Sequence, residues 1–309
     1  DVGRPRAMAP PPAPRSVAVL RFRTMGDARE DRYFADGMSE EIIQALARLD
    51  GVHVASRSSS FARSPGTLTA RDVGRRLGVA TLGEGSVRRD GERLRASVRL
   101  VDAANGYTRW SETFDRPAAD VFALQEAIAR AIAGALRVRL DEGSSLIARH
   151  RTTDAGTYDH YLRGRYLWWN APSEQGVRES VREFGRAVSR DSAFAPAWVG
   201  LADAHFGLTA YHDVAPAAVI ATARAALQRA LALDSTLADV HAGLGYLHTF
   251  HDLDWSAAES HFRRALALDP RNGRTHLYYA WMLATRGRHA EALDEIRRAR
   301  SLDPLDPRI

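Results

Sequence analysis

Residues 265–270 read Ala-Leu-Ala-Leu-Asp-Pro, and residues 299–304 repeat this as Ala-Arg-Ser-Leu-Asp-Pro. Two looser copies, with Ser in place of Pro, begin at Ala187 and Ala230. The four copies are spaced by 43, 35 and 34 residues, and each follows an amphipathic helical stretch. A unit of this length cannot bury its apolar face alone and must stack on its neighbours. The repeat therefore predicts an α-helical solenoid of about four units.

Small residues recur at fixed places inside each unit. In the last unit Ala280, Ala292, Ala299 and Pro304 lie at offsets of 0, 12, 19 and 24, with Gly287 in the turn between the helices. This arrangement resembles the tetratricopeptide repeat (TPR), in which small residues lie where the helices cross and Pro restarts the chain. The three preceding units fit with one, nine and four extra residues between their helices, counted backwards along the chain.

The composition excludes several classes of function. The 309 residues are enough for two domains, and the absence of cysteine excludes disulfides, thiolate metal sites and Cys nucleophiles. All 43 basic residues are Arg, so there is no P-loop lysine or Schiff base, and we expect no cofactor. The formal charge of +5 comes from Arg residues mixed with acids, which favours a solvated surface over a nucleic-acid interface.

The two ends indicate a piece of a longer protein. Residues 1–15 are rich in Pro and Ala, begin without Met and predict a linker rather than a signal peptide. After Pro304 the sequence begins another unit at Leu305 and stops without the polar capping helix that solenoid ends require. No apolar run approaches the roughly 20 residues that span a bilayer, so we expect membrane attachment only through a segment outside this chain.

The first half of the chain has a different periodicity. Thr69 and Asp72 have the spacing of a capping box, and the helix they begin should end at Gly78. Asp90-Gly91 and Asn105-Gly106 predict tight hairpins, because both favour positive φ. The expected elements are, in chain order, strand 17–22, a helix from 36, strand 52–55, helix 69–78, strands 79–88, 93–101 and 107–114, and helix 120–140.

The order β-α-β-α-β-β-β-α predicts an α/β sheet domain with helices packed against it. We place this domain at residues 16–141 and a linker at 142–156. The all-α TPR solenoid then occupies residues 157–309.

Eight short motifs of the first half form an ordered set. They are Ser16-Val-Ala-Val-Leu, Tyr33-Phe-Ala-Asp-Gly, Ser56-Arg-Ser-Ser-Ser-Phe, Leu77-Gly-Val, Glu84-Gly-Ser-Val-Arg-Arg, Leu100-Val-Asp, Trp110-Ser-Glu and Phe122-Ala-Leu-Gln-Glu. Together they resemble the TolB amino-terminal-like domain over about residues 16–140. Arg21 departs from the pattern, since Pro is expected after the first strand.

This resemblance carries expectations about role and compartment. In bacteria the TolB-like domain commonly precedes TPR units in membrane-anchored Ser/Thr kinases, winged-helix regulators and class III adenylate cyclases. It implies a regulatory or assembly role rather than a reaction. It also implies the extracytoplasmic side of a membrane-anchored protein.

Two short stretches of the first half have alternative interpretations. Gly83 and Gly85 suggest a phosphate loop, but they lie inside an expected strand, which favours a bulge or a close backbone approach. Residues 58–60 are three serines beside Arg57 and could bind an anion, although a hydrogen-bonded turn is the favoured interpretation.

The histidines of the second half invite a metal hypothesis. His241, His248 and His251 share one helical face, but His241 and His248 occupy bulky packing positions of the repeat, as do His205 and His276. We therefore favour core or partly buried histidines over metal ligands. No His-Glu-x-x-His, Gly-x-Ser-x-Gly or Walker sequence appears, and only a catalytic triad assembled in space stays open.

The solenoid offers the best candidate site. By resemblance to the TPR, positions two, five, nine and twelve of each first helix face the concave side, and these positions are rich in aromatic residues and Arg. The predicted partner-binding residues are Tyr158, Tyr161, Arg165, Trp168, Asp203, Phe206, Asp239, Tyr246, Arg274 and Trp281. The alternative is that the aromatic residues pack against adjacent helices or against the first domain.

Two classes of function follow. The favoured one is a non-catalytic regulatory or scaffolding region of a bacterial signalling protein, which binds a protein or peptide in the concave groove. The α/β domain would couple that event to an upstream catalytic or DNA-binding domain, or mediate homodimerisation. The alternative is a small-ligand receptor with a pocket between the α/β domain and the first TPR helices, near residues 161–169.

Overall fold

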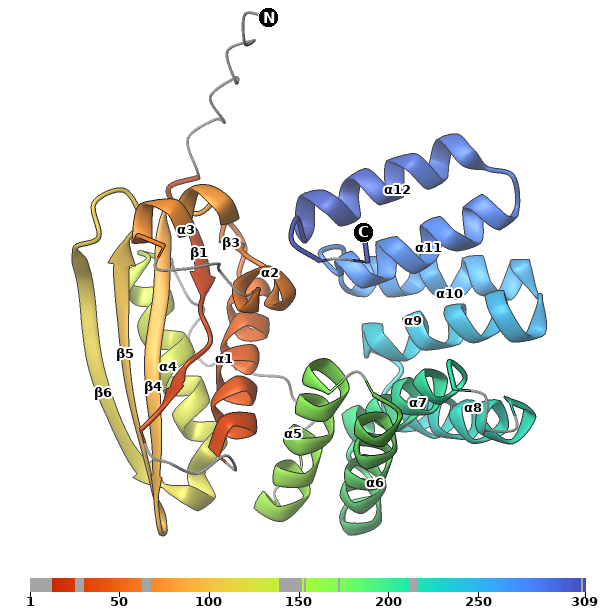
Figure 1. The fold of residues 1–309 in the computed structure, drawn as a ribbon, viewed down its shortest axis with the longest axis horizontal. Coiled ribbons are helices and arrows are strands. Elements are labelled where there is room, and N and C mark those ends of the chain that lie inside the picture. Colours follow the sequence, from red (N-terminus) through yellow and green to blue (C-terminus); the bar gives the residue numbers. More distant parts are fainter. Residues whose placement is uncertain are drawn as a thin grey trace, which may run out of the picture.

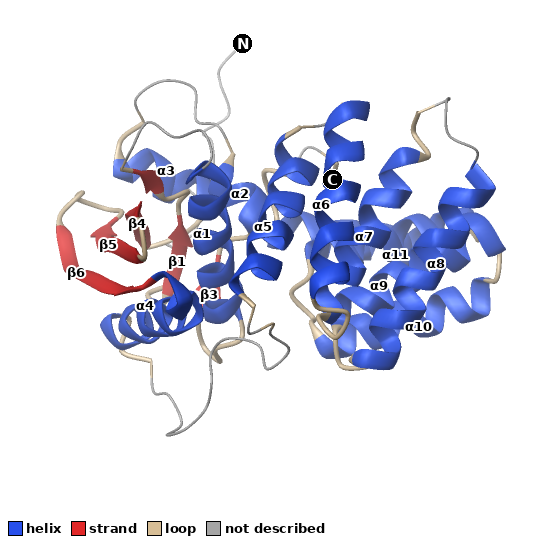
Figure 2. Ribbon diagram, turned by 90° about the horizontal axis from the view of Figure 1, so that it is seen from below, coloured by secondary structure: helices blue, strands red, loops and turns tan. Residues whose placement is uncertain are grey.

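The computed structural model shows a sheet-containing region beside an array of helices (Figure 1). It describes residues 13–25, 31–62, 68–138, 152, 154–171, 173–211, 216–306 and 308–309. The strands are confined to one end of the molecule and the helical array forms the other (Figure 2). The linkers expected at 1–15 and 142–156 fall largely outside the described residues.

The sheet is mixed and has the strand order β3-β1-β4-β5-β6, with β2 paired to β4. β1 runs parallel to β3 and β4, whereas β4, β5 and β6 form an antiparallel meander. Gly91 and Gly106 have φ of +56° and +80° in the two connecting turns, as the hairpin sequences predict. The strands are β1 (Ser16–Val19), β2 (Arg23–Thr24), β3 (His53–Val54), β4 (Thr81–Asp90), β5 (Arg93–Asp102) and β6 (Thr108–Pro117).

Helices cover both faces of this sheet. On one face, the alternating apolar residues of β5 share a core with apolar residues of α1 and α4. On the other, the apolar residues of α3 pack against Val79, Leu82 and Val101. The helices are α1 (Asp31–Ala47), α2 (Arg57–Phe61), α3 (Ala70–Leu77) and α4 (Val121–Ala135), with the 3₁₀ turn η1 (Ala118–Asp120) before α4.

The element order differs from the expected eight-element pattern by two insertions. β2 has two residues, too few to leave a period in the sequence, and α2 is a single short helix capped by the side chain of Ser56. α1 also begins at Asp31 instead of 36, and α4 ends at Ala135, before the expected end at 140, which lies outside the described residues. The capping box at Thr69 and the left-handed C-cap at Gly78 are confirmed.

The second half of the chain is an array of antiparallel helix pairs. The small residues that define the repeat, such as Ala202, Ala258, Ala265 and Ala280, are fully buried where the helices cross. The helices are α5 (Ala155–Asn170), α6 (Glu174–Arg190), α7 (Ala195–Leu208), α8 (Pro216–Leu233), α9 (Ala238–Leu247), α10 (Trp255–Leu268), α11 (Gly273–Thr285) and α12 (His289–Leu302). Within the described residues, no helix is long and apolar enough to cross a membrane.

One irregular turn accommodates the extra residue of the third unit. After α9 the chain makes a π-helical turn, η2 (His248–Asp252), and Leu253 then adopts φ of +54°. A π turn holds one more residue than an α turn, so a single insertion fits without breaking the helix pair. The turn carries Phe250 and His251, which both contact Tyr246.

Candidate functional site

The predicted groove residues fall into two groups. Tyr158, Tyr161 and Arg165 of α5 lie between the solenoid and the α/β domain. The other seven lie on the first helices α5, α7, α9 and α11 of the four units. They are Trp168, Asp203, Phe206, Asp239, Tyr246, Arg274 and Trp281.

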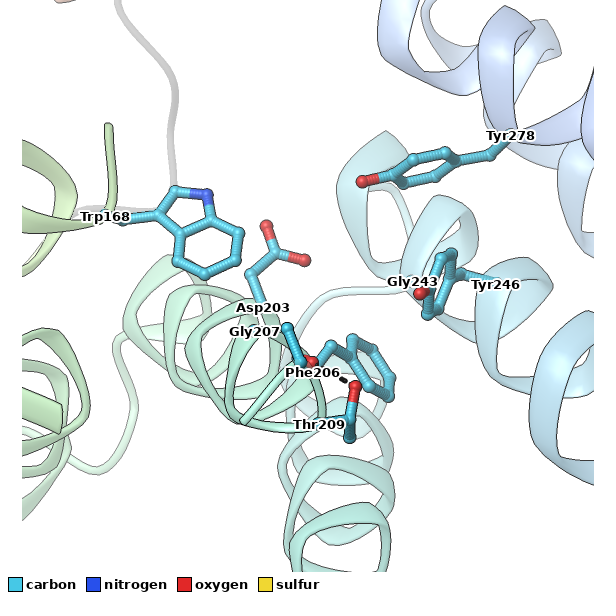
Figure 3. Close-up of a pocket in the computed structure, with 9 residues that line it drawn as sticks. Trp168, Asp203, Phe206, Gly207, Thr209, Gly243, Tyr246 and Tyr278 are labelled. Atoms are coloured by element: carbon cyan, nitrogen blue, oxygen red, sulfur yellow. Dashed lines mark hydrogen bonds between the residues drawn. The ribbon is translucent and has the colours of Figure 1, made fainter. Parts of the chain in front are cut away.

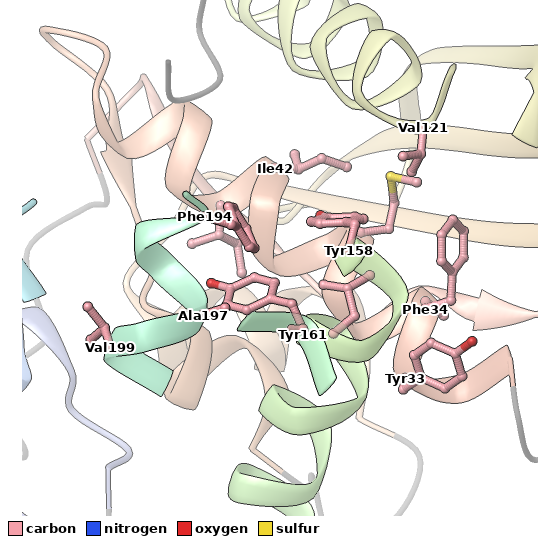
Figure 4. Close-up of a cluster of buried hydrophobic side chains, with 14 of the residues drawn as sticks. Tyr33, Phe34, Ile42, Val121, Tyr158, Tyr161, Phe194, Ala197 and Val199 are labelled. Atoms are coloured by element: carbon pink, nitrogen blue, oxygen red, sulfur yellow. The ribbon is translucent and has the colours of Figure 1, made fainter. Parts of the chain in front are cut away.

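Tyr158 and Tyr161 of the first group are buried in a core that the two regions share (Figure 4). The Tyr158 ring lies 4.6 Å from the Phe122 ring of α4, and its hydroxyl accepts a hydrogen bond from Gln125 Nε2 at 2.7 Å. Tyr161 packs edge-on against Phe194. Burial raises the pKa of both tyrosines well above its usual value. These side chains are therefore not open to a partner, and we correct the groove prediction for them.

A buried ion cluster completes this contact. Glu40 of α1 accepts a hydrogen bond from Arg165 and forms an ion pair with Arg57 at 3.1 Å. Arg165 also donates to the Tyr161 hydroxyl at 2.9 Å, and Arg57 lies 4.7 Å above the Trp169 ring. Thus the place expected for a small-ligand pocket, near residues 161–169, is largely filled by the protein's own side chains.

Four residues of the second group, Trp168, Asp203, Phe206 and Tyr246, line a pocket of about 270 Å³ between the helices of the array (Figure 3). Its walls are aromatic rings, small residues and one carboxylate. It is lined by Trp168, Asp203, Phe206, Gly207, Thr209, Ala210, Gly243, Tyr246 and Tyr278.

The sequence missed five of these lining residues. Tyr278 follows Leu277, which holds a concave position, and its own position belongs to no concave set. Gly207 is a glycine inside a helix, and this is a sequence signal of a close contact. A Cβ at this position would come within 2.3 Å of the Trp168 ring. Thr209 and Ala210 directly follow the last residue of α7, beyond the four concave positions of that unit.

A chain of ring contacts leads from the pocket to the surface. Phe206 contacts Tyr246, Tyr246 contacts Tyr278, and Tyr278 contacts Trp281, with ring centres 5.1, 5.1 and 5.4 Å apart. Phe250 bridges Tyr246 and Trp281. We call these five residues the aromatic strip. Its outer end is exposed, since Phe250 and Trp281 keep 38% and 37% of their surface accessible.

The charges of the pocket centre on one arginine. Arg274 donates to Asp203 Oδ2 at 2.7 Å, and a second of its nitrogens lies 3.4 Å from Asp239 Oδ1. Burial alone would lower the pKa of Arg274, but Asp203, Tyr278 and Asp239 together raise it. The guanidinium is thus a fixed cation shared by two carboxylates.

Several histidines have structural partners. His241 and His276 are buried, and each ring Nε2 lies 3.1 Å from the carbonyl oxygen six residues earlier, that of Ser235 or Pro270. His251 is exposed, which differs from the expected partial burial, because η2 turns it outward against Phe206. Across the part of the chain that the structure describes, no group of three or more His, Asp or Glu could hold a metal ion.

The helix pairs and the buried small residues make a TPR-like helical array. The tetratricopeptide repeat family model matches residues 253–309. The chain is also similar to the protein named "Putative adenylate cyclase 3" of Rhizobium meliloti (strain 1021), with 38% identity over 201 residues. That match covers 63% of this chain but only 34% of the relative, so the chain spans about a third of that protein.

Solved structures with some likeness include a TPR protein. TTC0263, a thermophilic TPR protein of Thermus thermophilus, is 18% identical with a TM-score of 0.42, covering 61% of this chain and 89% of that one. MamA is 20% identical with a TM-score of 0.35, covering 47% and 77%. The repeat assignment itself rests on the family match and on the buried small residues.

Proposed function

We propose that this chain is a non-catalytic binding region of a bacterial signalling protein, and that it holds a segment of a protein partner along the aromatic strip. The aromatic strip carries the proposal. It joins an exposed end at Phe250 and Trp281 to a pocket that can take an inserted side chain. Aromatic anchors beside a pocket are where binding energy concentrates in protein interfaces.

Binding is favoured over chemistry by the composition of the pocket. Its one carboxylate, Asp203, is tied to Arg274, and the remaining lining residues are aromatic, small or hydroxyl-bearing. A catalytic cleft would bring together ionisable groups with opposed tasks. The family match over residues 253–309 supports the same conclusion, since TPR units typically bind other proteins.

The signalling context is also part of the proposal. The similarity to "Putative adenylate cyclase 3" supports a role beside a nucleotide cyclase or a comparable output domain. We assign residues 16–141 to the TolB amino-terminal-like family and give that domain the role of coupling partner binding to the output domain, or of forming a homodimer. From the resemblance alone we further propose an extracytoplasmic location.

The test is a selection of binding peptides from a random dodecapeptide library, followed by calorimetric titration of the strongest one. We expect Tyr246→Ala and Trp281→Ala to weaken binding by at least about thirty-fold, the size of a hot-spot loss of roughly 2 kcal/mol. Leu293→Ala is the matched control, because Leu293 is 55% exposed on α12 and lies outside the aromatic strip. Unchanged affinity in the first two variants would falsify the assignment of the groove.

A further inference from the structure

We infer that the pocket takes the cationic end of a Lys or Arg side chain from the bound segment. This inference rests on the proposed function and adds to it the chemistry of the partner. Three features carry it: the aromatic walls, the balance of charges and the size of the pocket.

The walls place four aromatic rings around the space where an inserted group would lie. Trp168, Phe206, Tyr246 and Tyr278 come from α5, α7, α9 and α11, so all four units contribute one ring. The Asp203 carboxylate points into the space between Trp168 and Tyr278 (Figure 3). Ring faces attract cations electrostatically, and an adjacent carboxylate adds a charged acceptor.

The charges around the pocket sum to a negative value. Asp203 and Asp239 share the one positive charge of Arg274, which leaves a net charge of −1. Asp306 and Arg308 also influence the pKa of Tyr278. They form an ion pair with each other, so their charges cancel. The His251 ring stacks against Phe206, and partial desolvation lowers the pKa of its imidazole.

An acidic segment would find no comparable partner here. The lining, as the structure describes it, contains no cationic side chain. Arg274 already forms ion pairs with two carboxylates, and Arg165 forms an ion pair with Glu40. Within the described residues, Asp203 Oδ2 accepts from Arg274 while Oδ1 has no hydrogen-bond partner, so one oxygen stays available to a donor.

The size of the pocket suits a side chain. Sites for whole drug-sized ligands are roughly 300–1,000 Å³, whereas this pocket holds about 270 Å³. A long side chain can extend its apolar stem along the rings and place its charged end at Asp203.

The experiment uses the peptides selected for groove binding. Each Lys is replaced in turn by norleucine, which lacks the ammonium group but keeps the four-carbon stem. Each Arg is replaced by citrulline, which removes the charge and keeps the length of the side chain. We expect one such replacement to weaken binding to the wild-type protein at least ten-fold. In Asp203→Asn the same replacement should change affinity less than three-fold, because the charge it removes has lost its acceptor.

Asp239→Asn is the matched control. It also takes one carboxylate from Arg274, but Asp239 does not line the pocket. We expect Asp239→Asn to preserve at least a ten-fold effect of the peptide replacement. If both variants reduce the effect equally, a direct contact with Asp203 is wrong, and circular dichroism of both variants checks that they fold alike.

The two proposals can fail separately. If selected peptides lose binding in Tyr246→Ala but depend on no Lys or Arg, the cationic pocket is wrong and the groove stands. If no peptide is selected, N-acetyl-lysine methylamide is titrated against the wild-type protein and Asp203→Asn, with tryptophan fluorescence as the readout. Saturable quenching in the wild type alone supports the pocket without the groove, and its absence overturns the pocket.

Discussion

The solenoid meets the α/β domain at two places, and the two contacts are built from different chemistry. In the first interface, α5 lies against α1 and α4, and Tyr158, Tyr161 and Leu162 belong to a core that continues into both regions. In the second, Asp303 and Leu305 contact α2: Asp303 accepts hydrogen bonds from the hydroxyls of Ser58 and Ser59, and the Leu305 N–H donates to Ser59 Oγ. Arg271 adds a hydrogen bond to the Val52 carbonyl at 2.7 Å.

This difference assigns different roles to the two contacts. Burial of apolar surface stabilises by roughly 25 cal/mol per Å² and is lost only when the core opens. A polar contact exchanges hydrogen bonds with water for hydrogen bonds within the protein, and each is worth only about 1 kcal/mol net. The first interface therefore makes the two regions fold as one unit. The second holds the far end of the curved array (Figure 1) and can open at small cost.

The largest expected effect comes from the first interface. Leu162 is buried against Gly37 of α1, where an added Cβ would lie 2.6 Å from the leucine side chain. Leu162→Ala should lower the free energy of unfolding by about 2–5 kcal/mol, the usual cost of a core cavity. Urea denaturation measures it, with the exposed Leu293→Ala as control at about 0.5 kcal/mol or less. A loss below about 1 kcal/mol would contradict a shared core.

An intermediate effect depends on pH. Burial raises the pKa of Asp36, near Arg21 and Arg57, to about 6. Because this exceeds the unfolded value of about 3.9, the carboxyl contributes stability that is fully present below pH 4. That contribution is lost as the pH rises through about 6.

Asp36→Asn removes this titration. Relative to the wild type, the variant should therefore gain about 1–2 kcal/mol between pH 4 and pH 7. The comparison is made by urea denaturation at both pH values. Asp90→Asn, at an exposed ion pair with Arg88, should show no such gain, and equal behaviour of the two variants would contradict the role of Asp36.

The smallest effect belongs to the second interface. Asp303→Asn should lower the free energy of unfolding by only about 1 kcal/mol, since the side chain keeps its size and one acceptor oxygen for the serine hydroxyls and loses only its charge. Limited proteolysis should nevertheless cut faster near residues 303–308, because the far end is released. A loss as large as that of Leu162→Ala would show that the two interfaces do not differ in kind.

Local signals explain what the sequence predicts well. The repeat spacing, the capping box at Thr69 and the hairpin glycines act over a few residues, and the structure confirms them. The contacts of residues 58–60 could not be predicted from such local signals, because they join residues that are far apart in the sequence. Ser59 donates to Asp303, which lies 244 residues away, so the expected turn is a short helix whose hydroxyls bind a distant carboxylate.

The groove residues show what a repeat pattern alone cannot predict. Tyr158 and Tyr161 hold the same repeat positions as residues of the later units, but in the first unit α1 and α4 cover that side. The repeat pattern describes one unit and its neighbours, and contains nothing about a domain packed on the first of them. Trp168, Asp203, Phe206 and Tyr246 were predictable because their surroundings are other repeats.

The most direct test of the account is hydrogen exchange measured by mass spectrometry, with and without a library-selected peptide. We expect slower exchange in α7, α9, η2 and α11, which carry the aromatic strip, and unchanged exchange in α1 and the first turns of α5. Protection confined to α1 and α5, or the absence of protection in α9 and α11, would contradict the claim that the concave surface binds the partner.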